Sequence, residues 1–161
     1  MGFFSKNGAP QLGGAGLVPL TKDRIKAGLE RAGWSYNVDS DGDIGGGWEY
    51  ASFYFFATGD DNELMCVRGS WRGQLPGDQF GRALEICNDW NADKLWPKTY
   101  ARVDDEGAVR LHTEHNVDFE QGLTDEQLSQ QLLCAVNTSM AFYESVNEAF
   151  PEVWAQYNPE A

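Results

Sequence analysis

The stretch GRALEICNDWNADKLWPK, residues 81–98, decides how the chain is organised. Apolar side chains recur in and just before it at the spacing of one helix face, at Phe80, Leu84, Cys87 and Trp90. An asparagine-rich segment and a Trp-Pro pair then end the helix, because a proline disfavours helical backbone in the residue before it. Three strand-like segments precede this helix and two follow it. The predicted order of elements is therefore helix, three strands, helix, two strands, helix (α-β-β-β-α-β-β-α).

Five segments have the composition of β-strands, with β-branched and aromatic residues between turn-forming residues. They cover residues 34–38, 48–57, 63–71, 98–104 and 108–119. The connections between them are short and rich in Asp and Gly, which favours hairpins and antiparallel pairing. The segment 48–57 is aromatic on both faces, which indicates a strand that is central or covered on both sides. We expect an α+β domain with a single antiparallel sheet of about five strands packed by helices.

The first and last helices have clear start signals. Thr21 can cap a helix that Gly33 ends. Thr124 followed by Gln127 fits a capping box, and the apolar side chains after it continue to Phe150. A proline follows Phe150 and ends this helix, so the short aromatic tail beyond it can fold back on the body.

The chain divides into an arm and a domain. Glycines and prolines in residues 1–20 predict a flexible N-terminal arm, whose Phe3 and Phe4 either dock on the body or are exposed. Residues 21–161 predict a single domain of ordinary length. The sequence shows no signal peptide and no run of membrane-spanning length, so we expect a cytoplasmic protein.

The composition is strongly acidic, with 12 Lys and Arg against 25 Asp and Glu and a formal net charge of -13. Such a charge repels phosphate backbones and anionic lipid head groups, so we expect neither nucleic acid nor membrane as a partner. Proteins remain as the class of partner. The three cysteines, Cys66, Cys87 and Cys134, lie far apart in apolar segments, which predicts buried, reduced thiols.

Metal and cofactor motifs are incomplete. Asp39, Asp41 and Asp43 have the alternate spacing of a calcium loop, but its sixth and twelfth positions hold Ile44 and Tyr50. A solvated turn is the favoured interpretation, with weak cation binding left open. The glycine run beside these residues lacks the Lys and Ser or Thr of a phosphate loop. The sequence therefore predicts no metal, no cofactor and no catalytic residues.

The segment 108–119 carries the alternative function. His112, Glu114 and Asp118 share one face of this predicted strand, and a small hydrolase would use these acidic residues with His112. Charged residues at alternate positions are also typical of any solvated strand face, which is the favoured interpretation. His115 lies on the opposite face and is expected to meet a helix with its hydrogen bonds satisfied.

The element order, the CNDWN…WPK stretch and the GLTDEQL entry into the last helix resemble the YbjN-domain family. The Trp34 that opens the first strand after a glycine and the Phe-Pro-Glu that ends the last helix also fit, and the resemblance covers residues 21–153. It implies bacterial sensory transduction regulators with a fold similar to type III secretion chaperones. It also implies a homodimer, and it supplies no catalytic residues.

These observations together predict a binding protein that is not an enzyme. The chain holds more aromatic residues than a small core needs, and rigid aromatic side chains serve as anchors at interfaces. The candidate partner-binding residues are Trp71, Phe80, Trp90, Trp96 and Tyr100. We expect a non-enzymatic protein-binding or regulatory module that forms a homodimer and holds a protein or peptide partner. The alternatives are the small hydrolase and a purely structural dimer.

Overall fold

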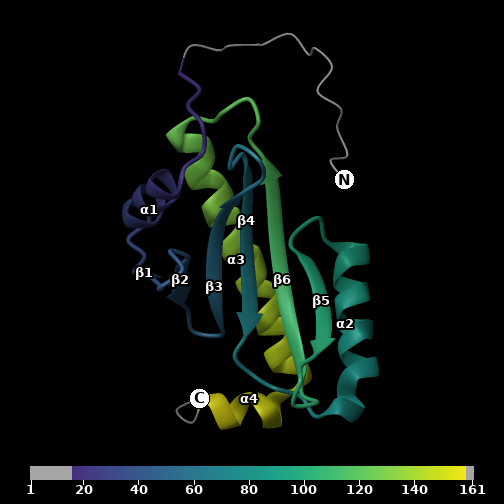
Figure 1. Ribbon diagram of the computed structural model, residues 1–161. Coiled ribbons are helices and arrows are strands. Elements are labelled where there is room, and N and C mark those ends of the chain that lie inside the picture. Colours follow the sequence, from purple (N-terminus) through teal and green to yellow (C-terminus); the bar gives the residue numbers. More distant parts are fainter. Residues whose placement is uncertain (1–15, 159–161) are drawn as a thin grey trace.

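The computed structural model describes residues 16–158, which form one antiparallel sheet of six strands with helices beside it (Figure 1). The strands lie in the order β1-β2-β3-β4-β6-β5. Their bounds are β1 Asn37–Val38, β2 Ile44–Gly47, β3 Ala51–Thr58, β4 Leu64–Trp71, β5 Lys98–Val103 and β6 Val109–Asp118. The helices are α1 Lys22–Arg31, the short η1 Gly77–Gln79, α2 Phe80–Asp93, α3 Asp125–Ala149 and α4 Pro151–Tyr157. The predicted α+β class with a single antiparallel sheet is confirmed.

The sixth strand, β2, lies in a glycine run that the composition predicts to be a turn. Glycine has low strand propensity, but pairing of β2 with β3 and local packing override it here. A Cβ atom at Gly46 would lie 2.8 Å from the ring of Trp48, so glycine lets that ring lie against the strand. Trp48 itself precedes β3, which begins at Ala51 rather than at residue 48.

The helices that pack on the sheet share one of its faces, and Figure 1 shows α3 running behind the strands. Thr113 and His115 of β6 are buried on this face. The hydroxyl of Thr113 hydrogen-bonds that of Tyr143 in α3 at 3.1 Å. Thr99 of β5 pairs with Thr113 and donates its hydroxyl to the carbonyl of Cys87 in α2 at 3.0 Å. Helices α2 and α3 therefore cover the same face.

Strand β3 shows what this arrangement does to a strand that is aromatic on both faces. Phe53 and Phe55 are buried under the helices, whereas Tyr54 between them is 42% exposed. The strand is central, between β2 and β4, as one of the two sequence alternatives predicts. The other alternative, coverage on both sides, is wrong, because no element within residues 16–158 packs over the second face.

Both predicted helix starts are confirmed. The hydroxyl of Thr21 accepts a hydrogen bond from the backbone of Arg24, and Thr124 and Gln127 form the reciprocal capping box. Gly33 ends α1 with a φ of 73°, a conformation that glycine adopts without strain. Helix α3 has 25 residues, so it spans the sheet over about 37 Å. None of the helices within residues 16–158 has the length and apolarity to cross a lipid bilayer.

The ends of the described chain join the core. Trp154 in α4 is largely buried and packs near Trp71 and Tyr50, which confirms that the aromatic tail folds back. Val18 pairs with Leu123 as an isolated bridge, and Leu20 is buried. Residues 18–20 therefore pack with the domain, although the sequence assigns them to the arm. Phe3 and Phe4 lie outside the described residues.

Helix α2 closes the edge of the sheet at β5. The apolar face predicted for this helix is confirmed at Cys87, which is buried. Leu84 is predicted on the same face but is partly exposed, and its neighbour Ala83 is buried instead. The amide of Asn91 accepts a hydrogen bond from the backbone N–H of Thr99 and donates one to its carbonyl, both at 3.0 Å. A neighbouring strand would make the same two contacts, so Asn91 occupies the place of a strand at this edge.

Candidate functional site

The second face of the sheet, which the helices leave uncovered, gathers aromatic and charged side chains from four strands. We call it the open sheet face. Its members point away from the helices at alternate positions of β3, β4, β5 and β6. They are Tyr54, Phe56, Cys66, Arg68, Ser70, Lys98, Tyr100, Arg102, Arg110, His112 and Glu114.

Glu114 lies at the centre of the charged part of this face, with its side chain only 11% exposed. Its carboxylate accepts hydrogen bonds from Arg68 Nε at 3.1 Å, from the Tyr100 hydroxyl at 2.9 Å and from Lys98 Nζ. Burial alone would raise the pKa of this carboxyl, but the bonds from Lys98 and Tyr100 outweigh it and lower the pKa to about 2. Glu114 is therefore ionised at neutral pH, and three donors hold it in place.

A pocket of about 390 Å³ opens beside Glu114. It is lined by Arg68, Lys98, Thr99, Tyr100, Arg102 and Glu114. Three cations and one carboxylate thus line this pocket, in a chain whose net charge is -13. Arg68 and Lys98 share Glu114, whereas Arg102 makes no ion pair with any residue of the described chain. The pocket is a local region of positive charge on an acidic protein.

An aromatic row borders the pocket. Tyr54 and Phe56 on β3 stack with their ring centroids 5.9 Å apart and their planes at 10°. The guanidinium of Arg68 lies 5.7 Å from the centroid of the Phe56 ring. On the other side, Tyr100 stacks on His112 at 5.2 Å. Arg68 therefore joins the aromatic row to the charged pocket, and the two form one continuous surface.

The surroundings of His112 bear on the hydrolase alternative. Its Nδ1 lies 2.9 Å from the Ser70 hydroxyl, and burial together with Arg102 and Arg68 lowers its pKa, so the ring is neutral at pH 7. Glu114 lies two residues along the strand but is engaged by its cations rather than by His112. Asp118 lies six residues away, about 20 Å along the strand. Strands β4 and β6 thus supply a Ser70–His112 pair, but within residues 16–158 no carboxylate is hydrogen-bonded to the imidazole to orient it, as hydrolysis by a triad requires.

His115 lies on the helix-covered side, as the alternation of the strand predicts. It is buried, and its Nε2 is 2.8 Å from Oε1 of Gln131 in α3. Its Nδ1 has no hydrogen-bond partner within residues 16–158. The expectation of a fully satisfied histidine is therefore met at one ring nitrogen only.

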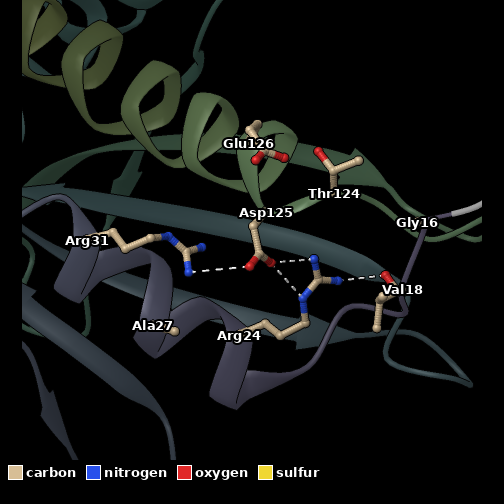
Figure 2. A pocket seen from close by; sticks show the side chains of 8 residues that line it. All are labelled: Gly16, Val18, Arg24, Ala27, Arg31, Thr124, Asp125 and Glu126. Carbon is tan, nitrogen blue, oxygen red and sulfur yellow. Dashed lines mark hydrogen bonds and ion pairs between the residues drawn. The ribbon is translucent and has the colours of Figure 1, made fainter.

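A second pocket, of about 530 Å³, lies between α1 and the start of α3 (Figure 2). Arg24 reaches across it to Asp125 at 2.8 Å and also donates to the backbone carbonyl of Val18 at 2.6 Å. Arg31 approaches the other oxygen of Asp125 at 3.6 Å. These contacts tie α1 to α3, so the charged groups of this pocket serve the fold.

The sequence-predicted partner-binding residues do not gather at one site. Tyr100 lines the pocket of the open sheet face, whereas Trp71 is 2% exposed and belongs to the core. Trp90 is partly buried against Phe142 of α3, and Phe80 is partly buried against the core. Trp96 is 51% exposed and lies over His115, on the helix-covered side.

Sequence reasoning missed Arg68 and Arg102. Both stand at outward positions of predicted strands, and cations there are notable in a chain of charge -13. That combination was the signal that could have found them. Aromatic content alone directs attention to the core, because most of the large aromatic side chains pack there.

The remaining candidate residues have structural settings. The carboxylate of Asp39 accepts hydrogen bonds from the backbone of Asp41 and Asp43, which makes a solvated turn between β1 and β2. Within residues 16–158 no group of three or more His, Cys, Asp or Glu is placed to hold a metal ion.

The three cysteines are free, but only Cys87 is buried, so the prediction of three buried thiols is wrong for Cys66 and Cys134. Cys66 lies on the open sheet face, where burial raises the pKa of its thiol.

Comparison with known proteins places the chain among relatives of unsettled function. The family described as "YbjN: Putative bacterial sensory transduction regulator" matches residues 21–148. Among solved structures the chain is similar to "Crystal structure of YbjN, a putative transcription regulator from E. coli", with a TM-score of 0.71 at 15% identity. That match covers 83% of this chain and 96% of the other, and at this identity it shows the fold alone. No curated protein matches the chain.

Proposed function

Since the chain belongs to the YbjN family, we propose that it is a non-enzymatic regulatory module that binds a protein partner on its open sheet face. The observation that carries the proposal is a sheet with helices on one face and a continuous aromatic and cationic surface on the other. Tyr54 is 42% exposed on the uncovered face of an antiparallel sheet, where polar side chains are the ordinary occupants. Exposed aromatic and arginine side chains that lie together are characteristic of protein interfaces.

Charge favours a protein over nucleic acid as the partner. The similar protein from E. coli is described as "a putative transcription regulator", which makes control of gene expression a candidate setting for the family. A chain with a net charge of -13 is repelled by DNA phosphates, and the three cations of the pocket are few against that field. Regulation through a protein contact agrees better with this balance.

A homodimer is the second part of the proposal. Leu95 is 85% exposed and Trp96 is 51% exposed just after α2, and Trp96 lies over His115 on the helix-covered side. Apolar side chains that project there offer a contact between copies that leaves the open sheet face free. A dimer would in this way present two open sheet faces to its partners.

Site-specific photo-crosslinking tests the proposed surface. A photo-reactive residue replaces Tyr54 on the open sheet face, and a matched one replaces Glu85, which is exposed on α2. In the native host, the Tyr54 position should give a reproducible crosslink to one partner, and peptide mapping should place the crosslink at Tyr54. The Glu85 position should not give it. A partner that crosslinks from Glu85 alone, or from both positions equally, contradicts binding on the open sheet face.

A further inference from the structure

Arg102 is the cation that the fold leaves without a partner in the described chain. It lines the pocket beside Arg68 and Lys98, which both bind the single carboxylate of Glu114. The nearby pair of Arg110 and Asp104 is neutral and does not offset the excess. A surface with an excess of one charge attracts ligands of the opposite charge. The pocket therefore has unfilled capacity for an anion.

We propose that this pocket binds carboxylate side chains of an acidic segment of the partner protein, while aromatic or aliphatic side chains of the same segment pack on Tyr54 and Phe56. The inference rests on the proposed function and names the chemistry of its partner. Arg68 carries the argument, because it donates to Glu114 at 3.1 Å and also lies 5.7 Å from the Phe56 ring centroid. A segment with both acidic and apolar side chains fits this continuous surface, whereas a free anion would use the pocket alone.

A second copy of the chain is a poor occupant of this face. A two-fold contact whose axis passes through the pocket would place Arg68, Lys98 and Arg102 against their own equivalents. Like charges opposed across an interface are unfavourable. An acidic segment of a partner protein meets no such repulsion at the pocket.

Replacing Glu114 should change the affinity in a direction that a purely structural role would not give. Its carboxylate already binds Arg68 and Lys98, so it competes with any incoming carboxylate for these two cations. Removing its charge in Glu114→Gln should free both cations and strengthen the binding of an acidic segment several-fold. A residue that merely supported the fold would weaken binding when changed.

The test uses short fluorescent peptides and the full-length protein. One peptide alternates Glu and Tyr, and two matched peptides carry Gln or Lys at every Glu position. Fluorescence anisotropy gives the affinities, and inorganic phosphate serves as the competing free anion. Amide shifts of the isotope-labelled protein then locate the bound peptide on the chain.

The Glu peptide should bind at least about tenfold more tightly than the Gln and Lys peptides, with shifts centred on Lys98, Tyr100 and Arg102. Arg102→Glu should weaken its binding about tenfold or more, since it replaces an attraction with a repulsion. Lys94→Glu makes the same charge change at the end of α2, where Lys94 pairs with Asp93, and should change the affinity less than about twofold.

Three results would overturn the inference. Equal binding of the Glu and Gln peptides would show that the pocket does not select carboxylates. Displacement by phosphate at concentrations similar to the peptide's own would assign the pocket to free anions. Absence of Glu-peptide binding to both the wild type and Glu114→Gln would refute the acidic segment. In each case the crosslinking experiment at Tyr54 still tests the proposed function independently of the peptide result.

Discussion

Replacing Asn91 with alanine removes the contact that closes the sheet edge at β5. The side chain of Asn91 makes two hydrogen bonds of 3.0 Å with the backbone of Thr99, and its Oδ1 shares the hydroxyl proton of Thr99 with the carbonyl of Cys87, at 3.2 Å and 3.0 Å. Each such bond contributes about 0.5–1.5 kcal/mol, and the higher helix propensity of alanine returns about 0.5 kcal/mol. Because water reaches part of this edge, we expect the free energy of unfolding to fall by about 1–3 kcal/mol.

Urea unfolding followed by tryptophan fluorescence measures this change, with Asn88→Ala as the matched control. Asn88 lies one turn earlier on α2, is exposed, and makes no hydrogen bond through its side chain within residues 16–158. Its replacement should leave the midpoint unchanged or slightly raised. Asn91→Ala should lower the midpoint with an unchanged slope, which marks a change in stability alone. Equal midpoints for the two variants would refute the role assigned to Asn91.

Three further predictions concern the sheet and the assembly. The pKa of Glu114 is lowered from 4.5 to about 2, so the stability that its carboxylate gives the folded state is complete above pH 4.5 and is lost as the pH falls through about 2. Glu114→Gln should flatten this part of the acid-unfolding curve, and an unaltered curve would contradict the prediction. Tyr143→Phe leaves the buried hydroxyl of Thr113 without its partner and should cost about 1–2 kcal/mol by urea unfolding, so a midpoint equal to that of the wild type would disprove this role. Light scattering should give the mass of a dimer at both low and raised salt, whereas a monomer at high protein concentration in both would end the homodimer proposal.

Local signals were sufficient for most of the fold. The capping box at Thr124 and the short Asp- and Gly-rich turns act within a few residues, so the sequence reveals them directly. Strand β2 could not be predicted in this way, because its glycines form a strand only through pairing with β3 and contact with Trp48. The buried place of Ala83 likewise depends on how α2 meets β5 and α3, which no local pattern records.

The candidate site depended on a fact that the sequence does not contain. Periodicity shows that β3 has two apolar faces, but not that the helices cover only one of them. Trp71 and Tyr54 therefore look equivalent in the sequence, although the first is in the core and the second is exposed. The cluster of Arg68, Lys98 and Arg102 arises only when β4, β6 and β5 pair in register, which brings together residues that are far apart in the chain.

Hydroxyl-radical footprinting tests the central claim most directly, because it reads the solvent accessibility of individual side chains with and without the partner that crosslinks to the protein. The open sheet face and the exposed ring of Trp96, which follows Leu95, lie on opposite sides of the sheet, so one experiment compares both surfaces. The account predicts that bound partner protects Tyr54, Phe56 and Tyr100 from oxidation and leaves Leu95 and Trp96 unchanged. Protection confined to Leu95 and Trp96 would contradict it.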